Sequence, residues 1–123
     1  MSHTQSELQV ITFAKNLLSY VMTITQKSPK QFRFSLIGRM QGYVLDIVEE
    51  LYYANDIHAT PASGTGWANR QAHQRKAMST LKLPVYAAQG SMEQGTIQPK
   101  QYEQIGKQAY NTVNLLGTWF ISD

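Results

Sequence analysis

Apolar residues recur at intervals of three and four along four separate segments of this 123-residue chain. In the first segment, from about residue 5 to residue 25, the recurring apolar positions are Val10, Phe13, Leu17, Tyr20 and Ile24. This spacing places the apolar side chains on one face of an α-helix, whereas a half-buried strand needs strict alternation. No alternating run is long enough to predict a strand. The pattern therefore predicts an all-α fold.

The second helix is predicted to begin at the stretch SPKQ. Ser28 suits the N-cap position, because its hydroxyl can accept a hydrogen bond from a backbone N–H of the first turn. Pro29 falls at the first helical position, where its missing N–H costs nothing. The apolar pattern continues until it fades near His58, and the ATPASGTG stretch that follows has the composition of a loop.

The fourth helix is predicted to begin at the similar stretch IQPKQY. Pro99 again suits the first helical position, which makes Gln98 the N-cap, although glutamine is a weaker cap than serine. Ile97 and Tyr102 occupy the two positions of a hydrophobic staple, which fixes how the chain enters a helix. Both Pro-Lys-Gln stretches are therefore interpreted as helix starts.

Proline and glycine interrupt the later helical segments. The third segment begins near Trp67, and Pro84 within it is expected to kink or break the helix. In the fourth segment, Gly106 and Gly117 each lower helix propensity by about 1 kcal/mol relative to alanine. Close approach by a neighbouring helix would explain both glycines.

Four amphipathic helices in one short chain predict an up-down four-helix bundle, with residues 1–123 forming a single domain. Hydrophobic residues make up 42% of the sequence, which argues against intrinsic disorder. The chain has no cysteine, so disulfides, thiolate metal sites and cysteine nucleophiles are excluded. We expect a cytoplasmic protein, because the N-terminal stretch does not resemble a secretory signal and no apolar run approaches the ~20 residues of a membrane span.

Basic residues dominate one long part of the sequence. The net charge is +3, and no acidic residue lies between Asp56 and Glu93. The predicted nucleic-acid and partner-binding residues are Arg70, Arg75, Lys76 and Lys82, with Lys100 and Lys107 as secondary candidates. Lysine and arginine contacts to phosphates give affinity without reading the base sequence. From these residues alone, a solvated face that keeps the bundle soluble remains the favoured alternative.

The sequence does not assemble a catalytic or metal-binding constellation. No metal-ligand spacing connects the three histidines, His3, His58 and His73. Glu49 and Glu50 are adjacent on a predicted helix and are interpreted as a solvated acidic face, since they lack the Glu-x-x-His pattern of di-iron bundles. Arg70 and His73 are too close together for the arginine–histidine spacing of helical-bundle ribonucleases. We therefore predict a non-enzymatic protein without a metal or cofactor.

Two long stretches resemble the Avd-like family of four-helix bundle proteins. They are PKQFRFSLIGRMQGYVLDIVEELYYA, at residues 29–54, and the sequence from residue 70 to the end. The features that carry the resemblance are Gln74 to Ala77, Leu81 to Leu83, Ile97 to Glu103 and Leu115 to Trp119. The likeness covers about residues 8–122, and a looser one connects the chain to bundle proteins encoded in ribosomal-RNA intervening sequences.

The resemblance implies an accessory variability determinant of a diversity-generating retroelement. Such a protein binds a reverse transcriptase and nucleic acid while template RNA is copied into mutagenised cDNA, and it forms a homopentamer. Homo-oligomerisation is also predicted from large aromatics that exceed what one small bundle readily buries, namely Tyr20, Tyr43, Tyr52, Tyr53, Tyr86 and Trp119. Two alternatives stay open: a structural or assembly bundle without nucleic-acid contact, and a ribonuclease, which the missing constellation disfavours.

Overall fold

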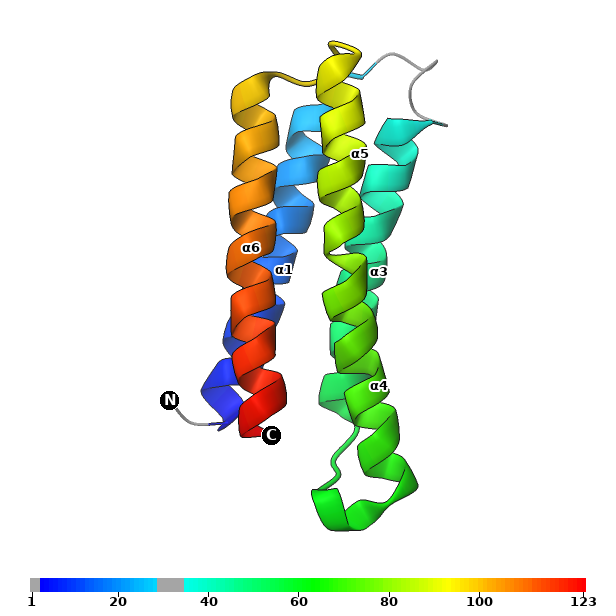
Figure 1. The fold of residues 1–123 in the computed structure, drawn as a ribbon, viewed down its shortest axis with the longest axis vertical. Helices are drawn as coiled ribbons and strands as arrows, with labels where there is room; N and C mark the ends of the chain where they lie inside the picture. Colours follow the sequence, from blue (N-terminus) through cyan, green and yellow to red (C-terminus); the bar gives the residue numbers. More distant parts are fainter. Residues whose placement is uncertain (1–2, 29–34) are drawn as a thin grey trace.

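The computed structural model describes residues 3–28 and 35–123, and their side chains from residue 9 onward. Within these ranges the chain forms helices and no strand. The elements are α1 (His3–Thr25), α3 (Leu36–Asp56), a short 3₁₀ turn η1 (Pro61–Ser63), α4 (Thr65–Thr80), α5 (Lys82–Glu93) and α6 (Pro99–Ser122). Figure 1 shows α4 and α5 stacked end to end as one column of a four-column bundle. The predicted all-α, up-down four-helix bundle is confirmed.

Each column packs against two neighbours. α1 lies between α3 and α6, and the α4–α5 column lies between the same two helices on the opposite side. Successive columns run antiparallel, so the start of α1 and the end of α6 lie at the same end of the bundle (Figure 1). The core contains the apolar stripes of all four columns, with Leu17, Met40, Ile47, Leu116 and Trp119 among its fully buried side chains. Phe13, predicted as part of the first stripe, is instead exposed.

The start of α6 matches its prediction, whereas the start at Pro29 lies outside the described residues. α6 begins at Pro99, and the weak N-cap at Gln98 is supported by Gln101, whose Oε1 accepts the Gln98 backbone N–H at 2.8 Å. Both staple residues, Ile97 and Tyr102, pack on the core. The side chain at the third helical position therefore forms the reciprocal bond of a capping box at the start of α6.

The third column breaks as predicted. α4 ends at Thr80 and α5 begins at Lys82. Because Pro84 has no N–H, it cannot donate to the Thr80 carbonyl four residues earlier, and the ladder is interrupted at that point. α5 ends in a Schellman motif, in which Gly95 adopts a positive φ and its N–H donates to the Met92 carbonyl at 2.9 Å.

The expected explanation for the glycines of α6 is wrong. A Cβ added at Gly106 or at Gly117 would meet no atom within 4 Å, so no neighbouring helix requires glycine there. Gly90 differs, because its added Cβ would lie 2.7 Å from Leu36 Cδ1. No helix in the described part of the chain is both long and apolar enough to cross a membrane.

Candidate nucleic-acid interface

Arg70, predicted to face solvent, is buried inside the bundle. Its guanidinium donates two hydrogen bonds to the Asp123 carboxylate, at 2.7 and 3.0 Å, and two to the backbone carbonyls of Ala54 and Ile57. The guanidinium also lies 5.2 Å from the Trp119 ring centroid. A buried arginine needs partners for its charge and its donors, and these contacts provide them. Arg70 therefore joins α4 to the ends of α3 and α6 and is excluded from the proposed surface.

Lys76 is exposed but faces α3. Its Nζ lies 3.2 Å from Glu50 Oε1, and the other oxygen of the same carboxylate contacts Nδ1 of His73. The prediction that Glu50 belongs to a solvated acidic face is wrong, because this residue is only 7% exposed. Burial alone raises the pKa of Glu50, but hydrogen bonds from His73 and Lys76 outweigh it and hold the pKa below its ordinary value.

Glu49 remains exposed and acts separately from Glu50. Its carboxylate accepts a hydrogen bond from the Tyr53 hydroxyl at 2.6 Å, and this bond raises the pKa of Tyr53. The Tyr53 ring in turn lies against His73, with centroids 5.3 Å apart. Glu49, Glu50, Tyr53, His73 and Lys76 thus form one cluster across the α3–α4 contact. Within this cluster Glu50 partly neutralises the ammonium charge of Lys76, which makes Lys76 a poor candidate for phosphate binding.

Arg75 and Lys82 lie on the other side of the third column, toward α6. The Arg75 guanidinium lies 5.4 Å from the Phe120 ring centroid, and Lys82 lines a groove between α5 and α6. Neither side chain forms an ion pair with a described residue. Of the four main predicted cations, Arg75 and Lys82 therefore lie on the α6 side of the third column, whereas Lys76 lies on the α3 side.

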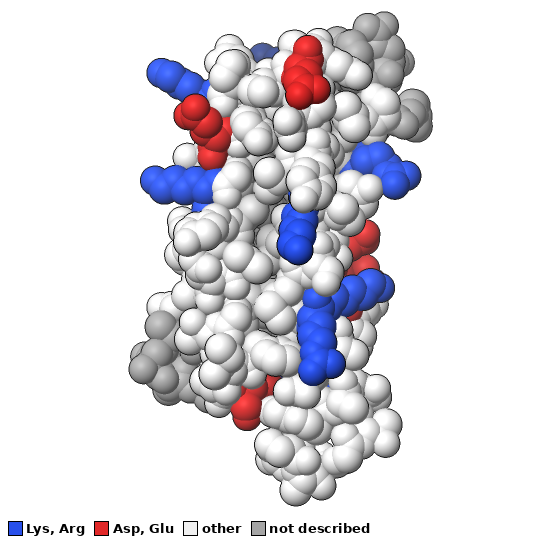
Figure 2. Space-filling view, in the orientation of Figure 1, with Lys and Arg blue, Asp and Glu red and all other residues white. Residues whose placement is uncertain are grey.

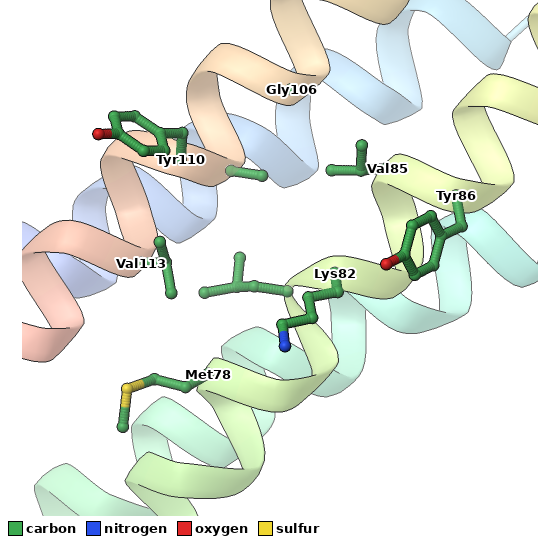
Figure 3. A pocket seen from close by; sticks show the side chains of 9 residues that line it. Met78, Lys82, Val85, Tyr86, Gly106, Tyr110 and Val113 are labelled. Atoms are coloured by element: carbon green, nitrogen blue, oxygen red, sulfur yellow. The ribbon is translucent and has the colours of Figure 1, made fainter.

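The groove beside Lys82 has a volume of about 270 Å³ and is lined mainly by apolar atoms. Figure 3 shows Tyr86 on α5 and Tyr110 on α6 at opposite sides of it, with Val85 and Val113 between the helices. Both tyrosines are strongly exposed, at 64% and 66%. Gly106 also lines the groove, and its missing side chain leaves space there.

Lys100 and Lys107 lie seven residues apart on the exposed stripe of α6. Lys107 directly follows Gly106 in the sequence, but successive helical side chains point about 100° apart, so Lys107 is not among the residues that line the groove. Glu103 lies between the two lysines along the same stripe. Figure 2 shows basic side chains spread along this face of the bundle, with acidic side chains between some of them. The basic surface is therefore a series of separate cations and not one continuous patch.

Sequence reasoning did not predict two features of the site: the Glu50–His73 pair and the exposed Tyr110. Glu50 and His73 are 23 positions apart, and only the antiparallel packing of α3 on α4 joins them, so no spacing rule reveals the pair. Tyr110 had a detectable signal. It is a large aromatic that lies about 100° around the helix from Ala109, beside the apolar stripe of α6 and not within it.

The described residues contain no group of three or more His, Cys, Asp or Glu side chains placed to hold a metal ion. Comparison of the chain with models of known protein families and with curated protein sequences found no match.

Proposed function

We propose that the protein is a non-enzymatic accessory protein of a diversity-generating retroelement, which binds nucleic acid and a reverse transcriptase during mutagenic reverse transcription. The observation that carries the nucleic-acid part is the pair of exposed cations, Arg75 and Lys82, on the α6 side of the third column. Neither is neutralised by a described carboxylate. The retroelement part rests on the sequence resemblance, and the helical bundle is compatible with it.

Binding through Arg75 and Lys82 is governed by phosphate charge. Cations that displace counterions from phosphates give an affinity that falls steeply with salt and depends little on base sequence. Lys107 adds a third cation on the neighbouring helix, and a homo-oligomer multiplies the contacts through avidity. The Lys76 charge contributes less, since Glu50 holds it.

Fluorescence anisotropy with labelled RNA, DNA and RNA/DNA hybrid, measured across a range of salt concentrations, tests this proposal. The double variant R75E/K82E is expected to weaken binding by orders of magnitude and to lower the salt slope by about 2, one for each lost phosphate contact. The control variant K15E/K27E makes the same charge change on exposed residues of α1 and the turn after it. Equal loss in both variants would refute a localised site, and no binding by the wild-type protein at low salt would refute nucleic-acid binding.

The reverse-transcriptase part has its own tests. We expect a reverse-transcriptase gene and a template/variable repeat pair beside the gene for this protein. The encoded polymerase is then expected to co-purify with the tagged protein. Absence of both would leave the resemblance without functional support.

A second candidate function, assembly without nucleic-acid contact, is favoured by the exposed aromatic rings. Trp119 does not contribute to them, because it is fully buried, which corrects its place in the predicted interface set. Tyr52, Tyr53, Tyr86 and Tyr110 are exposed on described helices, and aromatic residues are enriched at interfaces. Light scattering that gives a pentamer mass, together with no binding of nucleic acid, would favour this function.

A further inference from the structure

The groove between α5 and α6 combines two features that a solvated surface does not need. Tyr86 and Tyr110 present exposed rings from opposite sides of the same hollow, and its floor is apolar (Figure 3). Isolated exposed aromatics are common on protein surfaces. Two exposed rings at the two borders of one groove instead provide platforms on which flat ring systems can stack.

The positive charge at the edge of the groove favours an anionic ligand. Lys82 is among the lining residues, which include no carboxylate. The Lys82 ammonium forms no ion pair with a described residue. An apolar floor with exposed tyrosines and a lysine at its edge complements a ligand that carries both flat bases and phosphates.

A similar combination of tyrosine and cation lies on the far side of Tyr86. A second hollow there is lined by Arg39 and Tyr43 of α3, together with Tyr86 itself. The Arg39 guanidinium lies 5.5 Å from the Tyr43 ring centroid and donates to its hydroxyl at 3.0 Å. Tyr86 thus separates two hollows that each contain a tyrosine and a cation. A strand that crosses α5 would meet aromatic and basic side chains in turn.

We propose that this groove binds single-stranded RNA or DNA, with bases stacked on Tyr86 and Tyr110 and the backbone phosphate at Lys82. The inference rests on the proposed nucleic-acid binding and specifies the form of nucleic acid that the site takes. In a duplex the bases are already stacked on one another and cannot reach the rings. A volume of about 270 Å³ lies near the lower end of the roughly 300–1,000 Å³ of small-ligand pockets, so the groove admits bases but not a helix.

Gly106 makes a sharp test, because a side chain there fills the groove without disturbing the fold. An added Cβ meets no atom within 4 Å at Gly106 or at Gly117 of the same helix. Leucine is also a better helix former than glycine. G106L is therefore expected to fold and to block the groove, and G117L is the matched control outside it.

The assay compares a labelled single-stranded oligonucleotide with a duplex of equal length, using RNA and DNA versions of each. Base–aromatic stacking is worth about 1–3 kcal/mol per base, or roughly 5-fold to 150-fold in affinity. We expect the wild-type protein to bind single strands at least about tenfold more tightly than duplexes. G106L and Y86A/Y110A are expected to lose that preference, whereas Y86F/Y110F and G117L keep it.

The possible failures are distinguishable. If wild-type protein binds no nucleic acid, the proposed function fails and this inference fails with it. If it binds single strands and duplexes equally, or G106L binds single strands as tightly as G117L does, only the single-strand inference is overturned. If G106L or Y86A/Y110A lowers the assembly mass in light scattering, the groove is a contact between copies of the chain, which also overturns it.

Discussion

Replacing Arg70 with methionine is expected to be among the most destabilising single changes on α4. The variant R70M removes a cation that is only 3% exposed and leaves the Asp123 carboxylate, whose side chain is 1% exposed, without its main partner. It also removes the donors to the Ala54 and Ile57 carbonyls. Removing one partner of a buried ion pair costs about 3–5 kcal/mol, because the remaining charge stays uncompensated. That loss is a large part of the roughly 5–15 kcal/mol that stabilises a typical domain.

Urea unfolding followed by circular dichroism measures this loss. The control R75M removes an exposed arginine from the same helix, whose contact with Phe120 is worth about 0.5–1 kcal/mol. The double variant R70M/D123N is expected to be less destabilised than the sum of its single changes, since it removes the uncompensated charge. A cost for R70M as small as that of R75M, or simple additivity in the double variant, would refute the structural role assigned to Arg70. Folded R70M should still bind nucleic acid as wild type does.

The E50Q variant should lose about 1–3 kcal/mol of stability at neutral pH, because the amide cannot hold His73 and Lys76 as a carboxylate does. The pKa of Glu50 is lowered by folding, so its contribution is fully present above the ordinary pKa of 4.5 and is lost as pH falls through the lower folded-state pKa. Urea unfolding across that range should show a weaker pH dependence in E50Q, and identical pH profiles would contradict this. E49Q should lower the pKa of Tyr53 toward 10.0, measured as the tyrosinate absorbance that Y53F removes. G117A should raise the free energy of unfolding by up to about 1 kcal/mol, since its Cβ meets no neighbour and alanine favours helix. Thermal unfolding checks this, and a destabilised G117A would show that the site is not open.

The fold was predictable because its determinants are local. The apolar spacing in each segment requires only helix geometry, and Pro84 and Pro99 act on backbone hydrogen bonds a few residues away. Gln101 shows the same locality, since it caps α6 from three residues beyond Gln98. Which face of each helix turns inward follows from the same pattern, with Phe13 as an exception at the edge of its stripe.

The site was harder to predict because charge in the sequence does not reveal burial or partners. Arg70, Arg75 and Lys76 are close together in the chain, yet one pairs with Asp123 inside the bundle, one lies over Phe120 and one contacts Glu50. Their directions differ because each residue turns the helix by about 100° around its axis, so one side chain enters the bundle, one lies over α6 and one lies against α3. A basic run on a bundle helix is therefore divided among several different environments. Of these three residues, Arg75 lies on the α6 side without a described carboxylate partner, as does Lys82 beside the groove, and this is why the α6 side of the column and not the basic run defines the candidate interface.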